Sequence, residues 1–303
     1  MPLVDVVVVA FNSREQLRAC VEPLCTLDYV SVIVVDNASP DKSLEALDGL
    51  PVTAIASAVN GGFAYGCNRG FRAGSAPFVL LLNPDATIDA DSLSQLVAVL
   101  ESDDRVGAVA PRIIASDGSL DFSQRRFPRL RSTYARALFL HRIFPRAPWS
   151  DETIREMDRY ERPGSVEWVS GACMMLRHSA LDLVNGLDER FFMYCEDKDL
   201  CRRLWDQELE VRYEPRATAR HHGGASAPRA SLLPVLTASR VLYAEKHDNR
   251  LVTVLERAGL GLEALTRMVV SRGGLRRRTG YARSLRAAFG QTGDRSRPNP
   301  RVA

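Results

Sequence analysis

An apolar run that ends at a carboxylate is the first feature of this chain that could carry chemistry. Residues 78–82 are Phe, Val, Leu, Leu and Leu, and Asn83, Pro84 and Asp85 follow them. A continuous apolar run of this length predicts a strand buried on both faces, as in a parallel sheet. Ligands of open α/β sheets bind at the carboxyl ends of such strands, so Asp85 stands where a metal or a polar ligand would bind. An ordinary Asn-Pro-Asp turn is the equally good alternative.

Two further loops carry groups that suit a nucleotide. Asp36 ends the β-rich run 31–35, where its carboxylate could accept hydrogen bonds from a ribose or a base imide. The stretch 60–70 holds four glycines and leads into a helix, a pattern that lets backbone approach a phosphate closely. It matches neither the P-loop nor the Rossmann fingerprint. The alternatives are an Asp that caps the next helix and a flexible loop.

Two adjacent carboxylates, Glu196 and Asp197, begin a predicted helix. Asp197 and Cys201 share one face of that helix while Glu196 points elsewhere, so one acid can face a ligand while the other makes structural bonds. Acids at a helix N-terminus also interact favourably with the helix dipole, and that plain role is the alternative.

A histidine pair, His221 and His222, lies further along the chain. Neighbouring side chains of an extended chain point in opposite directions, so at most one of the two is expected to ligate a metal. One imidazole together with the Asp85 carboxylate suits Mn²⁺ or Mg²⁺, with ligand phosphates completing the shell. A pair of surface histidines is the alternative.

Strands alternate with helices over about the first 110 residues, which predicts βαβ units and a parallel sheet. Residues 117–165 are rich in Arg and Pro and have no clean period, so we expect a mobile insertion or lid over the site. Residues 1–228 are expected to form the catalytic domain, and 229–303 a helical, Arg-rich region with disorder at its end. The expected strands are 3–10, 31–35, 52–56, 78–83, 106–111 and 211–215, and the expected helices lie near 42–50, at 91–100 and from 196 onward.

The composition is that of a globular protein with an uneven charge. The chain has 303 residues, 46% of them hydrophobic, and no window is apolar enough to predict a membrane-spanning helix. Its six cysteines show no C-x-x-C or zinc spacing, and without a signal peptide they predict reduced thiols in a cytoplasm. Residues 251–303 hold eleven Arg against three acids, a net +8 in a chain whose total is +3. This predicts an anionic partner, nucleic acid or lipid headgroups, with a solvated tail as the alternative.

Taken in order, these motifs resemble glycosyltransferase family 2, of the GT-A fold, and most of all its bacterial rhamnosyltransferase-like branch. Each motif alone is weak, but the ordered set over residues 3–226 is specific. The motifs are Val8–Asn12, Val35–Ser39, Asn60–Ala64, Asn83–Ala86, Ser170–Cys173, Gly186–Phe192, Glu196–Leu204 and His221–Ser226. The resemblance implies a Rossmann-like, mostly parallel α/β sheet flanked by helices, with the helical C-terminal region as an appendage.

The resemblance also implies roles for single residues. Asp36 would bind the pyrimidine of the donor, and Asp197 would be the catalytic base, with Glu196 as a supporting acid. Asp85 and His221 would hold a divalent cation, Mn²⁺ or Mg²⁺. Further donor contacts would come from Phe11, Asn12, Asn60, Gly61, Gly62, Asn68, Arg69 and Asn83, and contacts on the acceptor side from Gly171, Ala172 and Tyr194.

The implied activity is an inverting, metal-dependent transfer of a sugar from a nucleoside-diphosphate donor, with dTDP-L-rhamnose as the best guess. The acceptor would be a glycan or a polyprenyl-linked sugar of cell-surface polysaccharide synthesis. Asn83 replaces the first Asp of the family's Asp-x-Asp motif, which predicts a loosely bound metal. The enzyme would be cytoplasmic, and peripheral on the inner face of the membrane if its C-terminal region binds anionic lipid.

Several alternatives stay open at this point. A UDP-hexose donor or a small-molecule acceptor would keep the same class of enzyme. A sugar-phosphate nucleotidyltransferase and a non-catalytic nucleic-acid-binding protein are alternatives of other classes, although nucleic acid is not the partner we expect. A homodimer is one alternative for the oligomeric state.

Overall fold

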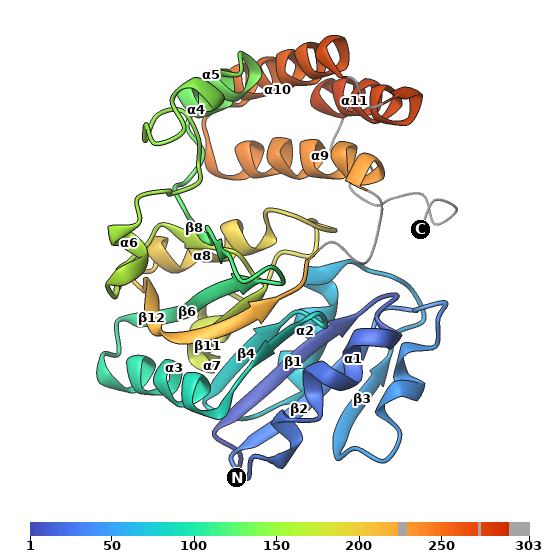
Figure 1. The fold of residues 1–303 in the computed structure, drawn as a ribbon, viewed down its shortest axis with the longest axis vertical. Coiled ribbons are helices and arrows are strands. Elements are labelled where there is room, and N and C mark those ends of the chain that lie inside the picture. The colour runs from blue at the N-terminus through green and yellow to red at the C-terminus, as the bar shows by residue number, and fades with distance from the viewer. Residues whose placement is uncertain (224–228, 272–273, 291–303) are drawn as a thin grey trace.

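The computed structural model describes residues 1–223, 229–271 and 274–290, which form a sheet body and a helical appendage (Figure 1). In the described residues, the body contains a ten-stranded mixed sheet with the order β3-β2-β1-β4-β11-β6-β12-β5. The short strand β7 pairs with β6, and β9 pairs with β12. The expected α/β sheet flanked by helices is therefore confirmed.

The N-terminal part of the sheet is parallel because its strands alternate with helical crossovers. Its strands are β1 Val4–Ala10, β2 Val30–Asp36, β3 Val52–Ala56 and β4 Phe78–Leu82. The connecting helices are α1 Arg14–Val21, η1 Leu24–Thr26, η2 Ser43–Leu47 and α2 Phe63–Ala73. Alternate residues of β1 enter two cores: Val6 and Val8 pack with α1, whereas Val7 and Val9 pack with α2. Burial on both faces explains why β4 is apolar throughout and why β1 is apolar except at Asp5.

The rest of the sheet mixes directions. Strand β11 Cys173–Arg177 lies antiparallel between β4 and β6 Val106–Ala115, because the chain that leaves β6 at one edge of the sheet re-enters at that same edge to form β11. Strand β12 Glu210–His221 runs parallel to β6 and antiparallel to β5 Ala86–Ile88. The helices of this part are α3 Ala90–Ser102, α7 His178–Leu183 and α8 Glu196–Asp206. The sheet is therefore parallel in its first half and mixed in its second.

The segment 117–165 is built of short elements that pack on both the body and the appendage. They are β7 Leu120–Asp121, β8 Gln124–Arg125, α4 Leu130–Ala137, α5 Leu140–Ile143, α6 Asp158–Glu161 and β9 Gly164–Ser165, and β10 Trp168–Val169 pairs with β8. Tyr160 is buried in the core of the body, and Tyr134 donates a hydrogen bond to the carbonyl of Leu255 in the appendage. The lid motion expected of this segment stays a prediction.

The C-terminal region is helical, as its sequence predicts. Its helices are α9 Arg229–His247, α10 Arg250–Val270 and α11 Gly274–Phe289, and they lie together at the end of the molecule far from β3 (Figure 1). Helix α11 continues through Gly280, where a Cβ atom would lie 2.6 Å from the carbonyl oxygen of Ala230. Glycine at this position therefore lets α11 pack closely on α9.

Some residues covered by the predictions above lie outside the described ranges. They are Gly224 to Ser226 of the last motif, Arg272, and Arg295, Arg297 and Arg301 of the tail. Within the described part of the chain, no helix has the length and apolar character needed to cross a bilayer. The six cysteines, all in that part, form no disulfide.

Candidate active site

A cavity of about 630 Å³ opens at the carboxyl edge of the parallel strands. It brings together residues from every group of candidates, because the carboxyl ends of parallel strands share one edge of a sheet. The predicted residues that line it are Phe11, Asn60, Gly62, Asn83, Asp85, Gly171, Ala172, Tyr194, Glu196, Asp197 and His221.

Asp85 and His221 meet in this cavity although they are far apart in the sequence. Strand β12 pairs with β5 so that His221 stands opposite Ala86, and the Asp85 carboxylate lies 3.2 Å from His221 Nε2. The amide nitrogen of Asn83 lies 3.2 Å from the same ring nitrogen. The hydrogen bond that His221 donates to the Asp85 carboxylate raises the pKa of His221, against the effect of burial. Burial would raise the pKa of Asp85, but the hydrogen bond and charge of His221 lower it overall.

This pair fits a divalent cation that takes its remaining ligands from a substrate. The two side chains retain 13% and 18% of their exposure, so both can be reached from the cavity. One carboxylate and one imidazole are ligands that Mn²⁺ accepts. Among the described residues, no group of three or more His, Cys, Asp or Glu side chains gathers around one point. A cation at this pair would therefore need further ligands from a substrate, and the loose binding expected from Asn83 stays a prediction.

Asp197 is held at the start of α8 by backbone donors. Its carboxylate accepts hydrogen bonds from the N–H of Gly171 at 3.0 Å and from the N–H of Lys198 at 2.7 Å. Tyr194 and Cys195, just before the helix, both have positive φ angles, 70° and 67°, which turn the chain sharply into α8. Burial raises the pKa of Asp197, while the two backbone hydrogen bonds and the charges of Lys198 and Arg125 oppose the increase.

Glu196 is the more strongly perturbed acid of the pair. It is only 6% exposed, and one of its carboxylate oxygens has no hydrogen-bond partner in the described structure. Burial, followed by the charge of Asp197, raises the pKa of Glu196 well above its usual range. Two adjacent carboxylates in one buried site do not both ionise readily. Since Asp197 has the donors that favour the ionised form, the arrangement suits an ionised Asp197 beside a protonated Glu196.

The glycine-rich loop is fixed by two asparagines. Asn37 donates to the carbonyl of Gly62 at 2.8 Å, and the side chain of Asn60 accepts from the N–H of Gly62 at 3.1 Å. Gly62 has φ 93°, and a Cβ atom there would lie 2.2 Å from the carbonyl oxygen of Phe192. Only glycine fits this close approach, which presents backbone to the cavity.

Asp36 lies at the end of β2, beside Asn37, a cavity-lining residue. One of its carboxylate oxygens accepts a hydrogen bond from the N–H of Ser39 at 3.2 Å. The other is buried and has no partner in the part of the chain that the structure describes. A buried acceptor of this kind is costly unless a ligand supplies a donor.

Besides Asp36, four residues predicted to contact the donor do not line the cavity. Asn68 is buried, and its amide binds Leu187 and Glu189, so it holds the loop that follows α7. Its assignment as a donor ligand is replaced by this structural role. Arg69 packs against the ring of Tyr65, and Gly61 lies under the same ring. The backbone N–H of Asn12 donates to the hydroxyl of Ser39 at 3.3 Å.

Several lining residues were not predicted from the sequence. They are Arg125, Arg136, Glu152, Trp168, Lys198 and Arg240. Glu152 binds Lys198 at 2.7 Å and lies 3.5 Å from Arg240, and both contacts are buried. Burial would raise the pKa of Glu152, but the charges of Lys198 and Arg240 lower it to about 2. The one indication of this cluster in the sequence was the high Arg content of residues 117–165.

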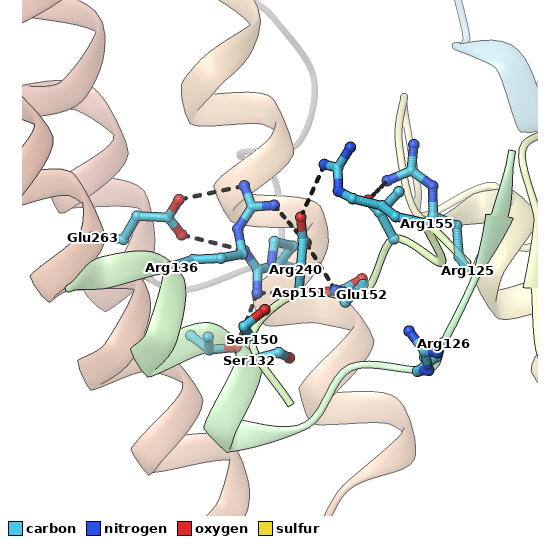
Figure 2. Close-up of polar contacts among 12 residues, drawn as sticks. Arg125, Arg126, Ser132, Arg136, Ser150, Asp151, Glu152, Arg155, Arg240 and Glu263 are labelled. Carbon is cyan, nitrogen blue, oxygen red and sulfur yellow. Dashed lines mark hydrogen bonds and ion pairs between the residues drawn. The ribbon is translucent and has the colours of Figure 1, made fainter. Parts of the chain in front are cut away.

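Figure 2 shows the part of this cluster that joins the insertion to the appendage. Arg136 of α4 contacts Asp151 at 3.3 Å and Glu263 of α10 at 3.4 Å. Arg240 of α9 also contacts Glu263, at 3.4 Å, and Glu256 at 3.0 Å. The insertion, the appendage and the helix that carries Asp197 are therefore linked by one buried ionic network.

Comparison with known proteins agrees with this geometry. A family model described as glycosyl transferase family 2 matches residues 5–184. The N-acetylglucosaminyl-diphospho-decaprenol L-rhamnosyltransferase of Mycobacterium tuberculosis is 32% identical over 271 residues, which cover 84% of this chain and 87% of the relative. The rhamnosyltransferase WbbL of Escherichia coli is 26% identical over 235 residues, or 73% of this chain and 83% of the relative.

Solved structures share the fold at low sequence identity. A mannosyltransferase from Pyrobaculum calidifontis, solved with GDP-Man and Mn²⁺, has a TM-score of 0.57 and 16% identity, and the match covers 95% of this chain and 86% of that one. GalNAc-T7, solved with UDP, GalNAc and Mn²⁺, has a TM-score of 0.56 and 12% identity over 86% of this chain and 54% of that one.

Proposed function

The chain belongs to glycosyltransferase family 2, and from that premise we propose an inverting, metal-dependent sugar transfer from a nucleoside-diphosphate donor to a lipid-linked sugar. The best candidate donor is dTDP-L-rhamnose, because two relatives bear rhamnosyltransferase names. A lipid-linked N-acetylglucosamine diphosphate is the acceptor that the name of the mycobacterial relative suggests. Because the chain belongs to this family, a nucleotidyltransferase and a non-catalytic nucleic-acid-binding protein are no longer competing classes.

The observation that carries the proposal is the presence of Asp197 and the Asp85–His221 pair in one cavity. Inversion needs a base on one face of the sugar and stabilisation of the leaving group on the other. In this proposal, ionised Asp197 takes the proton of the acceptor hydroxyl as that oxygen bonds to the anomeric carbon. The bond from the anomeric carbon to the diphosphate breaks in the same step, and its electron pair leaves with the diphosphate.

A divalent cation held by Asp85, His221 and the donor phosphates would offset the charge on the departing diphosphate. Glu196, kept neutral by burial and by the charge of Asp197, adds no second negative charge near the base. Asp36 offers its unpartnered carboxylate oxygen to the imide N–H of a pyrimidine. Gly62 and Asn60 supply the backbone edge along which the phosphates would lie.

The proposed location is the cytoplasmic face of a membrane, where a lipid-linked acceptor would be met. Large apolar side chains are exposed on the appendage at Val269, Val270, Leu275 and Phe289. Exposed arginines 276 to 278 follow in α11, so apolar and cationic groups lie together. Such a surface suits anionic lipid headgroups.

The test is a donor screen with the full chain, Mn²⁺ and a farnesyl-diphosphate-linked N-acetylglucosamine. We expect transfer from dTDP-L-rhamnose, release of the nucleoside diphosphate, and a product anomer opposite to that of the donor by NMR. Transfer from UDP-hexoses alone would replace the donor assignment. Retention of the anomeric configuration would overturn the mechanism, and release of pyrophosphate would overturn the class of reaction.

A further inference from the structure

The half of the cavity away from the glycine-rich loop has no role in the mechanism above. It is lined by Arg125, Arg136 and Glu152 of the insertion, Trp168 of β10, Lys198 of α8, and Leu232, Leu236 and Arg240 of α9. Four of these side chains are cationic and one is anionic. This half therefore combines positive charge with an apolar wall, which suits a ligand with both an anionic and an apolar part.

Three of the four cations already have carboxylate partners. Lys198 binds Glu152, Arg136 binds Asp151, and Arg240 is surrounded by glutamates. These ion pairs leave the three side chains few donors to offer a ligand. Their main effect is to hold the insertion, α8 and the appendage together around the cavity.

Arg125 differs from them. Its Nη1 donates to the hydroxyl of Thr153 at 2.8 Å, and its guanidinium lies over the ring of Trp168 at 5.8 Å. Its Nε is buried without a partner, and no carboxylate binds it within the described residues. Figure 2 shows Arg125 at the edge of the network. A partly buried guanidinium without a counter-ion is a favourable partner for an incoming phosphate.

The position of Arg125 relative to Asp197, the proposed base, limits which anionic group Arg125 could bind. Strand β8 pairs with β10 so that Arg125 stands opposite Trp168, three residues before Gly171. The N–H of Gly171 donates a hydrogen bond to the Asp197 carboxylate, and the positive charge of Arg125 acts to lower the pKa of that carboxylate. An anion on Arg125 would thus lie near the Asp197 carboxylate, and so near the hydroxyl from which Asp197 takes a proton in the proposed mechanism.

An apolar path begins beside these cations. Leu232, Leu236 and Arg240 are spaced four residues apart on α9, so they share one face of the helix. A second hollow of about 160 Å³ adjoins the cavity, because both are lined by Arg136, Leu236 and Arg240. Its other apolar lining residues are Leu233, Leu260 and Ala264, from α9 and α10.

We propose that this half of the cavity is the acceptor site for a sugar diphosphate that carries an apolar chain. Arg125 binds the diphosphate, and the chain leaves along Leu232 and Leu236 into the hollow between α9 and α10. The identity of the reacting sugar rests on the proposed function. The donor diphosphate is recognised separately, at the Asp85 and His221 end.

The experiment compares two acceptors that carry the same sugar. One is N-acetylglucosamine linked through a diphosphate to a farnesyl chain, and the other is the neutral octyl glycoside. The readout is the ratio of kcat/KM for the two acceptors, with KM and kcat measured separately. Any effect of Arg125 on the base Asp197 acts on both acceptors and cancels in this ratio.

Arg125→Gln is expected to raise KM for the diphosphate acceptor by about 10- to 100-fold, the scale of one charge-assisted hydrogen bond, and to change KM for the octyl glycoside by less than about threefold. Arg125→Lys should recover part of the loss. Arg126→Gln is the matched control, because Arg126 is the neighbouring residue, binds Glu156 at 2.7 Å and does not line the cavity. It should leave the ratio unchanged.

The apolar path has its own test. Leu236→Ser should remove most of the preference for a farnesyl over a methyl chain on the same sugar diphosphate, whereas Leu236→Met should keep it. An unchanged preference would overturn the path, and an unchanged acceptor ratio in Arg125→Gln would overturn the phosphate site. Either result, obtained while the wild-type chain transfers sugar, leaves the proposed function standing. A wild-type chain that uses no nucleotide sugar would refute that function instead.

Discussion

The carboxylate of Asp197 accepts a 3.0 Å hydrogen bond from the backbone N–H of Gly171. Gly171 lies between β10 and β11, so this bond fixes the N-terminus of α8 against the central sheet. A Cβ atom at Gly171 would lie 3.4 Å from the Cβ of Asp197, which is an ordinary van der Waals contact. Asp197, the proposed base, is therefore positioned by two segments that are separate in the sequence.

Replacing the base should lower the rate more than it affects binding. Asp197→Asn keeps the hydrogen bond from Gly171 but cannot accept a proton, so kcat should fall by about 10²- to 10⁴-fold while donor affinity changes little. Glu196→Gln should cost less, because Glu196 is already uncharged in the proposed mechanism. Steady-state kinetics of both variants measure this. A larger loss in Glu196→Gln would reverse the two assignments.

The metal prediction concerns Asp85. Asp85→Ala should abolish the thermal stabilisation that a nucleoside diphosphate gives in the presence of Mn²⁺, and should reduce transfer by at least about 100-fold. Asp91→Ala is the control, because Asp91 is an exposed acid in the first turn of α3. The measurement is a melting curve with and without Mn²⁺ and nucleotide. Near-normal activity of Asp85→Ala would remove this residue from the metal site.

The buried network should make a large contribution to stability. Glu152→Gln leaves Lys198 and Arg240 without their shared carboxylate, and breaking a buried ion pair in this way costs about 3–5 kcal/mol. Glu156→Gln breaks the more exposed pair with Arg126 and should cost less than about 1 kcal/mol. Urea unfolding of the two variants gives the comparison. If the two substitutions lowered the unfolding free energy equally, burial would not make the ion pairs of Glu152 more important for stability.

The same carboxylate predicts how stability depends on pH. Its pKa is lowered to about 2 in the folded protein, below the value of about 4.3 expected for an unfolded chain. Its stabilisation should therefore be complete above the unfolded pKa and be lost as the pH falls toward 2. The slope of the unfolding free energy between about pH 4.5 and pH 2 should be smaller in Glu152→Gln than in the wild type.

Gly62 is predicted to be intolerant of a side chain for two reasons. Its φ is 93°, and a Cβ atom would lie 2.2 Å from the carbonyl oxygen of Phe192. Gly118→Ala is the control, since its φ of 81° is similar but nothing lies within 4 Å of the added Cβ. The control should cost about 1–2 kcal/mol from backbone strain alone, and Gly62→Ala clearly more. Similar costs would mean that the chain near Phe192 shifts freely.

Membrane binding is best tested with point substitutions. A truncation after Gly259 would cut α10 and remove Glu263, which binds Arg136 and Arg240 in the buried network. Changing the exposed arginines 276 to 278 to Gln should instead lower binding to anionic vesicles by about 100-fold, at about 1 kcal/mol for each charge. The control changes Arg14, Arg18 and Lys42, three exposed cations on the N-terminal part of the sheet body. Equal losses in both triple variants would indicate a general charge effect.

The strands and the chemical groups at their ends follow from the sequence alone. The apolar run before Asn83 predicts β4, and the same local pattern predicts β1 and β3 almost to the residue. Because parallel strands end at one edge, the positions of Asp36 and Asp85 at that edge also follow. These features depend on local periodicity and on a general rule of sheet topology, which a single sequence contains.

The tertiary structure alone decided which side chains meet. Asn68 belongs to a glycine-rich motif, yet it is buried against Leu187, because α2 packs on the loop after α7. Glu152, Lys198 and Arg240 come from three separate segments, and no local period relates them. Long-range contacts of this kind depend on how helices and insertions pack on the finished sheet. The second half of the cavity is therefore a product of tertiary packing, whereas the edge of the sheet that it faces is already specified by the sequence.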